Sequence, residues 1–199
     1  ITVENVERVL LDDTSLNLCV DDAQKMLSKI VDRNDLHERD NLERFNNILM
    51  AEIAEHMVIQ WFVSQGKFVE SAVDKDSNTP DSGHDIWLKQ SDGKKVKCSI
   101  KSSLSYSKGV DGILSTFKLA TTFNELRDIN IQVYFWLNLY PAENSSRKTF
   151  ISFANSAIIG WFGINDLKSF QSYNYEKRLA PTVVLNQARS MQSLLEYLI

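Results

Sequence analysis

A carboxylate and an ammonium group stand at opposite ends of a predicted β-hairpin in the middle of the chain. Asp85 lies near the start of the first expected strand, residues 84–90, and Lys101 ends the second, residues 95–101. Carboxylates bind hard divalent cations, and a nearby ammonium group stabilises charge that develops on a phosphate during hydrolysis. With the Ile100 carbonyl oxygen and a carboxylate from a helix, these groups predict a site for metal-assisted phosphodiester cleavage.

The helix that precedes the hairpin supplies two candidate carboxylates. Asp40 and Glu43 form a capping-box pattern at the start of an expected helix over residues 41–64. Glu52 and Glu55 project into or beside the apolar stripe of that helix. A carboxylate on a buried stripe needs a partner, and the simpler interpretation is a salt bridge or cap to a neighbouring element. The alternative is that these glutamates face a cation or a reacting phosphate.

The register of the hairpin decides whether Asp85 and Lys101 share one face of the sheet. Asp92 and Gly93 form a strong turn signal between the two strands. An ideal two-residue turn would pair residue 85 with residue 100 and place Asp85 on the apolar side. A shared site for Asp85 and Lys101 therefore requires a loop with an odd number of residues, or a β-bulge.

The remaining patterns predict the scaffold around this hairpin. The first 34 residues indicate helix, loop and helix, with Asp21 and Asp22 capping the second helix, and several further elements follow the glycine at position 66. These are strands at 67–73, 131–140 and 149–153, an apolar segment at 157–162, a loop at 173–178, and helices at 112–127, 165–170 and 186–198.

Composition limits the classes of protein to which the chain can belong. With 199 residues, 43% of them hydrophobic, we expect one compact domain. Cys19 and Cys98 lie far apart among apolar neighbours, which predicts buried free thiols in a reducing compartment. The sequence contains no segment long and apolar enough for a membrane span and no signal-peptide pattern, so we expect a cytoplasmic protein.

A local cluster of lysines is the candidate surface for nucleic acid. The formal net charge of −4 argues against binding driven by overall charge. Lys95, Lys97 and Lys108, with Lys94 and Lys101, form the densest basic segment. Alternatively, these lysines only keep the solvent-exposed edge of the hairpin from pairing with another strand.

Three short segments together resemble the PD-(D/E)xK nuclease superfamily of restriction-type endonucleases and Holliday-junction resolvases. They are Ala-Glu-Ile-Ala-Glu (51–55) ahead of Gly66, Gly-His-Asp-Ile (83–86), and Ser-Ile-Lys-Ser-Ser (99–103), followed by a helix and a strand. The resemblance covers about residues 41–198. It implies an α/β fold with a mixed sheet, a restriction endonuclease-like αβββαβ core at 41–140, an N-terminal helical extension at 1–40 and a C-terminal strand and helix extension at 141–199.

The resemblance also implies roles for individual residues. Glu55, Asp85 and Lys101 would be catalytic, and Mg²⁺ or Mn²⁺ would be held by Asp85, Glu55 and the Ile100 carbonyl. Ser99 stands where relatives usually carry a second acidic residue, and a serine is a weak, neutral ligand for such an ion.

Two further residues are secondary candidates for the same site. Glu52 lies one helical turn before Glu55 and is its substitute. Ser103 would donate a hydrogen bond to a phosphate or simply end the strand.

The leading functional hypothesis is a metal-dependent DNA endonuclease of restriction or anti-phage defence type. Its partner would be DNA, and a homodimer or further domains or subunits of a larger system would fit the same interpretation. The alternative is a catalytically inactive nuclease-fold module that binds nucleic acid or protein, favoured by Ser99. A third hypothesis is an unrelated α/β protein in which Asp85 and Lys101 form an ordinary surface ion pair.

Overall fold

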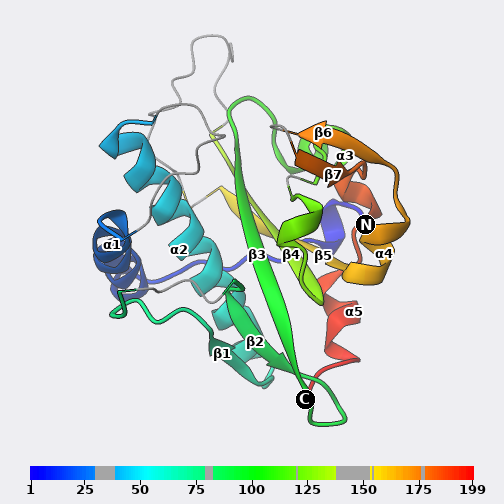
Figure 1. Cartoon of the computed structure of the whole chain (residues 1–199), viewed down its shortest axis with the longest axis horizontal. Helices are drawn as coiled ribbons and strands as arrows, with labels where there is room; N and C mark the ends of the chain where they lie inside the picture. Colours follow the sequence, from blue (N-terminus) through cyan, green and yellow to red (C-terminus); the bar gives the residue numbers. More distant parts are fainter. Residues whose placement is uncertain (30–38, 79–82, 120, 138–152, 154, 176–177) are drawn as a thin grey trace.

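A five-stranded mixed sheet forms the centre of the computed structural model, which describes residues 1–29, 39–78, 83–119, 121–137, 153, 155–175 and 178–199 (Figure 1). The strand order is β1–β2–β3–β4–β5. β3 and β4 run parallel, whereas the other neighbouring pairs are antiparallel. The expected α/β class with a mixed sheet is therefore confirmed. The strands are Val69–Ser71 (β1), Ile86–Lys89 (β2), Lys95–Ser105 (β3), Ile129–Trp136 (β4) and Ser156–Gly163 (β5).

Helices and a small second hairpin surround this sheet. The element order from α2 to β4 is helix, three strands, helix and strand, as the sequence predicted. The α-helices are Asp13–Leu27 (α1), Asn41–Ser64 (α2), Val110–Thr116 (α3), Ile164–Ser169 (α4) and Met191–Leu195 (α5). Short 3₁₀ turns are Val3–Asn5 (η1), Phe123–Glu125 (η2) and Leu185–Gln187 (η4), and β6 (Ser172–Tyr175) pairs with β7 (Arg178–Pro181).

The sheet separates two hydrophobic clusters, which define its two faces. Buried side chains of α1, α2 and α5 pack with Val96 and Cys98 of β3, and Ile100 packs against the same cluster. Side chains of α3 and η4 pack with Tyr134 and Trp136 of β4 in the second cluster. Successive side chains of a strand alternate between faces. The even-numbered residues of β3 therefore lie on the face covered by α2, called the α2 face, and the odd-numbered ones on the opposite face.

Both ends of α2 form as the sequence indicates. The Asp40 side chain accepts a hydrogen bond from the Glu43 amide at 2.9 Å, which satisfies a free N–H of the first turn. Gln65 caps the other end, and Gly66 follows with φ of +68°, a conformation that glycine adopts without steric cost. These ends fix which residues of α2 face the sheet.

The hairpin loop has the odd length that a shared face requires. The Gln90 amide donates to the Lys94 carbonyl at 2.9 Å, so residues 91–93 form the loop. The Gly93 amide donates to the Gln90 carbonyl, and Gly93 has φ of +87°. This is the three-residue loop in which a turn is followed by a left-handed glycine. It pairs Ile86 with Cys98 and so sets the register of β2 against β3.

The predicted N-terminal helix–loop–helix is wrong in its first part. The residues before α1 run along β5, where Glu7 and Ile158 exchange backbone hydrogen bonds of 3.0 and 2.9 Å. Asp12 caps α1 by accepting from the Ser15 amide, and Asp21 and Asp22 lie inside the helix. The backbone hydrogen bonds to β5 stabilise this segment, whereas a short isolated helix is only marginally stable in water.

Other elements differ in type or length from their predictions. Helix α3 ends at Thr116 because the following chain pairs with the segment near Val183, to whose carbonyl the Leu119 amide donates. The closing helix is likewise reduced to η4 and α5. The apolar segment 157–162 belongs to strand β5, and the described residues of the predicted loop, 173–175 and 178, belong to β6 and β7. The strand predicted at 149–153 lies almost wholly outside the described residues, and only position 153 is described.

Cys19 and Cys98 are buried free cysteines, as predicted. Among the described residues, none of the helices has the length and apolar character required to cross a bilayer.

Candidate functional site

A bulge at the start of β2 positions Asp85. Ile86 pairs with Cys98, yet the Asp85 amide also donates to the Cys98 carbonyl, at 3.0 Å. Asp85 and Ile86 thus both lie opposite the single residue Cys98. This is the pattern of a β-bulge, in which the extra residue changes the direction of a side chain. The Asp85 carboxylate then accepts a hydrogen bond of 2.5 Å from the Ile100 amide. Burial, and then the negative charge of Asp85, raises the pKa of Cys98, which lies on the α2 face.

The two glutamates of α2 meet a lysine that comes from the loop after β1. The Lys75 ammonium contacts a Glu52 carboxylate oxygen closely and lies 3.8 Å from a Glu55 oxygen. The Ser71 hydroxyl donates to the same Glu55 oxygen at 3.0 Å. Glu52 and Glu55 are buried, and the Lys75 side chain is only 12% exposed. These contacts form a compact charged group beneath the surface.

Burial controls the proton affinity of the two glutamates. Desolvation, together with the charges of Glu52 and Asp85, raises the pKa of Glu55 to about 7 against the opposing effects of Lys75 and of the hydrogen bond from Ser71. Desolvation also raises the pKa of Glu52, while Lys75 lowers it. Because Asp85 contributes to both shifts, its carboxylate lies within electrostatic range of both glutamates. Near neutral pH, Glu55 can therefore accept or release a proton.

Asp22 of α1 and His56 of α2 extend this group. One ligand atom from each of Asp22, Glu52 and His56 lies within 4.8 Å of the others, close enough for one cation to contact all three. The Lys75 ammonium is 3.7 Å from Asp22. Burial and then the charge of Lys75 lower the pKa of His56, which favours the neutral imidazole, the form that binds metals. We call Asp22, Glu52, Glu55, Asp85 and Lys75 the acidic cluster.

The structure does not bring Lys101 to the acidic cluster. Lys101, Ser99 and Ser103 are odd-numbered residues of β3 and lie on the opposite face from α2. Lys101 pairs with Gln132 of β4, and no hydrogen bond or ion pair joins it to another described residue. The bulge turns Asp85 toward α2, whereas the regular register of β3 keeps Lys101 away. The predicted surface ion pair between Asp85 and Lys101 is absent for the same reason.

The predicted lysine patch is divided between the two ends of β3. Lys95 forms a 2.5 Å ion pair with Glu70, and the Lys97 ammonium lies 5.8 Å from the centre of the Trp87 ring. Lys108 follows the other end of the strand and donates to the Thr116 hydroxyl at 2.8 Å. From Lys97, β3 continues for about 26 Å at roughly 3.3 Å per residue. Lys95 and Lys97 therefore do not form one surface with Lys108.

Lys75 and Asp22 are the members of the cluster that sequence reasoning missed. Lys75 stands in a polar loop, and Asp22 was interpreted as a helix cap. One usable signal is that Asp22 lies at i+3 from Cys19, which places both residues on the same side of α1. Nothing local marks Lys75, because only the folding of the loop against α2 brings it to the carboxylates.

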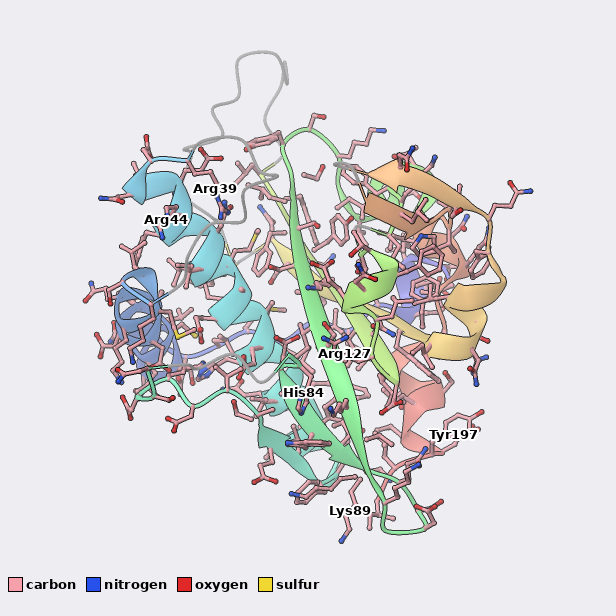
Figure 2. The ribbon with its side chains drawn as sticks, viewed as in Figure 1. Arg39, Arg44, His84, Lys89, Arg127 and Tyr197 are labelled. Carbon is pink, nitrogen blue, oxygen red and sulfur yellow. The ribbon has the colours of Figure 1, made fainter. Side chains whose placement is uncertain are left out.

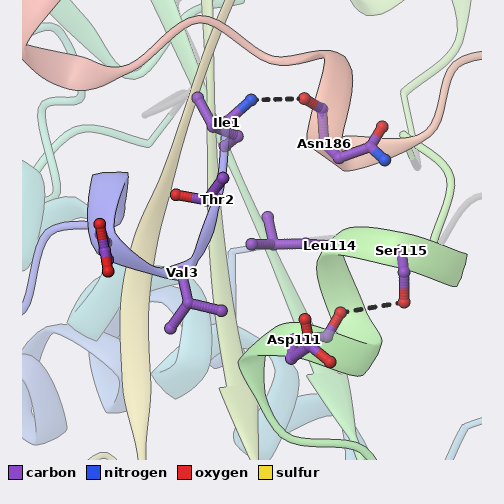
Figure 3. A pocket seen from close by; sticks show the side chains of 8 residues that line it. Ile1, Thr2, Val3, Asp111, Leu114, Ser115 and Asn186 are labelled. Atoms are coloured by element: carbon purple, nitrogen blue, oxygen red, sulfur yellow. Dashed lines mark hydrogen bonds between the residues drawn. The ribbon is translucent and has the colours of Figure 1, made fainter.

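One cavity formed by described residues lies elsewhere in the molecule. It has a volume of about 390 Å³ and is formed by residues 1–4, by α3 residues including Asp111 and Ser115, and by Asn186 (Figure 3). The Ile1 amino group donates to the Asn186 carbonyl at 2.6 Å along its wall. None of the acidic-cluster residues lines this cavity. The charged side chains are the better guide, because the cavity holds no comparable concentration of titratable groups.

Comparison with known proteins gives no relative for this chain: no family model, curated protein or solved structure matches it.

Proposed function

We propose that this protein is a metal-dependent nuclease that hydrolyses phosphodiester bonds of DNA at the acidic cluster. The observation that carries the proposal is the convergence of Glu55, Asp85 and Lys75, with the pKa of Glu55 raised to about 7. Perturbed carboxyl groups of this kind concentrate at catalytic sites, although structural ion pairs also produce them.

The order and pairing of the elements support the same proposal. A helix, three antiparallel strands, a helix and a parallel strand are the arrangement that the resemblance to restriction-type nucleases implies. The helix acid and the acid at the start of β2 are both on the α2 face. We propose that Lys75 takes the role that the resemblance implies for Lys101.

The residues of the cluster fit the divalent cation that such chemistry uses. Glu52, Glu55 and Asp85 offer carboxylate oxygens, the ligands that Mg²⁺ and Mn²⁺ prefer. The His56 imidazole would favour Mn²⁺ over Mg²⁺ if it joined Asp22 and Glu52 as a ligand. When bound, such an ion supplies Lewis-acid stabilisation of the charge on the phosphate.

The residues themselves would supply proton transfer and charge. With a pKa of about 7, Glu55 can accept a proton from an attacking water near neutral pH. The Ser71 hydroxyl orients the Glu55 carboxylate, and the buried Lys75 ammonium places positive charge beside it. The hydrogen bond from the Ile100 amide fixes Asp85 and so connects the strand end with the helix.

A second candidate, a nuclease-fold binding module without catalysis, rests on the position of Lys75. Its ammonium already neutralises the carboxylates that a cation would need, and Ser99 supplies no charge in place of a second motif acid. In this case the cluster would be an internal ion-pair network that joins α1, α2 and the loop after β1.

The decisive experiment compares cleavage of plasmid, linear and branched DNA in Mg²⁺ or Mn²⁺. We expect metal-dependent cleavage that Glu55→Gln and Asp85→Asn each reduce by at least about a hundredfold, in the range typical for loss of a general base. Glu196→Gln is the matched control, because Glu196 is exposed and far along the chain in the C-cap of α5. Absence of cleavage on every substrate, or equal loss in the control, would reject the nuclease proposal.

Lys75→Met separates the two candidates. If Lys75 only neutralises the carboxylates, its removal strengthens Mn²⁺ binding, measured by titration calorimetry, and creates no cleavage activity. If Lys75 acts in catalysis, the variant still binds Mn²⁺ but cleaves far more slowly than the parent protein. Refolded variants need matching circular dichroism spectra before the two results are compared.

A further inference from the structure

We propose a site for Zn²⁺, or for a divalent ion of similar ligand preference, where α1 packs against α2, with two ligands from each helix. The four ligands are Cys19, Asp22, Glu52 and His56. Sulfur, nitrogen and carboxylate oxygen together form the ligand set that Zn²⁺ accepts in proteins. The site does not rest on the proposed nuclease activity, because neither Glu55 nor Asp85 is among its ligands.

Helical spacing brings the two ligands of each helix to one side. In α1, Asp22 follows Cys19 by three residues, and in α2, His56 follows Glu52 by four. Residues three or four positions apart are neighbours on the surface of a helix. The two helices lie side by side in the fold (Figure 1). Each helix can therefore offer two ligands to one ion at their contact.

Three of the four ligands already lie near the separation that such an ion requires. One ligand atom from each of Asp22, Glu52 and His56 lies within 4.8 Å of the others. The ligand atoms of a tetrahedral zinc ion are about 3.3–3.8 Å apart, because each lies at about 2.0–2.3 Å from the metal. Rotation of these side chains supplies the remaining approach, so α1 and α2 can keep their positions.

The other observation is that Cys19 and His56 are left without hydrogen bonds. Neither side chain makes one with a described residue, and Cys19 is 0% exposed. Burial, together with nearby carboxylates of which Glu52 has the largest effect, raises the pKa of the Cys19 thiol to about 12 against the opposing effect of Lys75. The thiol therefore lies within electrostatic range of the carboxylates. A metal ion deprotonates a coordinating thiol, and thiolate and imidazole ligands favour Zn²⁺ over Mg²⁺.

Lys75 places a positive charge between two of the proposed ligands. Its ammonium group contacts Glu52 and lies 3.7 Å from Asp22, so this position already attracts a cation. Lys75 belongs to the loop after β1 and to no helix or strand, so its side chain can leave without a change in α1 or α2. We expect a divalent ion, which carries twice the charge, to displace the ammonium group and to join the two helices directly.

Titration of the EDTA-treated full chain with Co²⁺ under reducing conditions, followed by absorption spectroscopy, tests the site. Co²⁺ serves as a spectroscopic substitute for Zn²⁺. We expect saturation at one ion per chain, with the strong visible absorption of a tetrahedral ion and a near-ultraviolet band from a bond between thiolate and metal. Added Zn²⁺ should remove both signals. Absence of a saturable spectrum, or the weak spectrum of a six-coordinate ion held by oxygen atoms alone, would overturn the proposal.

Two pairs of matched variants assign the ligands. Cys19→Ser should abolish the near-ultraviolet band, whereas Cys98→Ser, at the other buried cysteine, should retain it. His56→Gln should weaken Co²⁺ binding at least about tenfold, since loss of a ligand costs no less than loss of a group that orients one. His84→Gln is its control, because His84 is also a buried histidine and Figure 2 shows it well apart from α1. Equal losses within either pair would contradict the ligand assignment.

Asp22→Asn repeats the test at a partly exposed position, so the result does not depend on the folding of a variant at a more buried ligand. It should also weaken Co²⁺ binding at least about tenfold. Asp21→Asn is the control, because Asp21 is the exposed neighbour of Asp22 in α1. Unchanged binding in Asp22→Asn, or equal weakening in Asp21→Asn, would count against the site.

Asp85→Asn keeps the result distinct from the nuclease proposal. This variant should lose DNA cleavage and still bind Co²⁺ as the parent chain does. Loss of Co²⁺ binding in Asp85→Asn would place the ion at the proposed nuclease site and overturn the separate site. Conversely, a parent chain that cleaves no DNA but binds Co²⁺ through His56 would reject the nuclease proposal and support this one.

Discussion

The two faces of β3 carry opposite kinds of polar chemistry. On the α2 face, buried carboxylates surround one lysine, and every charge of the acidic cluster has a partner. On the opposite face, Lys101 and two serines lie in a row without partners among the described residues. Paired buried charges depend on one another, because removal of one leaves its partner uncompensated. The comparison therefore separates residues that depend on one another from residues that make no polar contact with a described side chain.

The largest effect should come from removing the lysine of the acidic cluster. In Lys75→Met, Glu52, Glu55 and Asp22 lose their shared cation, and we expect the free energy of unfolding at pH 8 to fall by about 3–5 kcal/mol. Part of the loss should return at pH 5, where the glutamates can be protonated. Urea unfolding at the two pH values measures both effects. Lys25→Met, which removes an exposed ion pair with Asp22, is the control and should cost far less, because exposed ion pairs contribute little to stability.

The raised pKa of Glu55 on the α2 face should make the stability of the protein depend on pH. The folded-state pKa of about 7 lies above the ordinary value of 4.5, so the folded protein keeps a proton that the unfolded chain loses between these values. The free energy of unfolding should therefore fall as pH rises from about 4.5 to 7, by up to about 3 kcal/mol. Glu55→Gln should flatten this fall and stabilise the protein at pH 8. A Gln variant with the parental slope would contradict the assignment.

A smaller effect on stability is expected at the bulge that precedes β2. Asp85→Ala leaves the Ile100 amide without its acceptor and should lower the free energy of unfolding by about 2 kcal/mol. Asp85→Asn retains an acceptor oxygen and should lose less. Thermal or urea unfolding of both variants measures the difference, and equal losses would show that the hydrogen bond contributes little.

The smallest effect on stability should come from the opposite face. Lys101→Met removes no hydrogen bond or ion pair with a described residue, so we expect a change within about 0.5 kcal/mol. Urea unfolding of this variant measures the change in the free energy of unfolding. A loss as large as that of Lys75→Met would erase the contrast between the faces and show that Lys101 is also structurally paired.

Local signals identified much of the fold because they depend on neighbouring residues. The capping pair Asp40 and Glu43 predicted the start of α2, and Gly66 predicted its end. The helices predicted at 112–127 and 186–198 were too long, since their later residues pair with distant chain segments instead of continuing the helix. Periodicity carries no information about such distant partners.

The candidate site was predictable only in part. Glu52, Glu55 and Asp85 were named from their elements, and the structure places them within electrostatic range of one another. Lys101 was named with them, but strand parity puts it on the other face. Lys75 could not be named, because the loop that carries it has no pattern that indicates where it packs.

The amino-acid sequence by itself determined the order of helices and strands, the hairpin and the carboxylates of α2, because periodicity, caps and turn residues act over a few neighbouring positions. Only the tertiary structure decided which amine joins those carboxylates. A single bulged residue turns Asp85 toward α2, and the packing of a loop against two helices brings in Lys75. Both events depend on contacts between segments far apart in the chain, where the short-range patterns of the sequence have no influence.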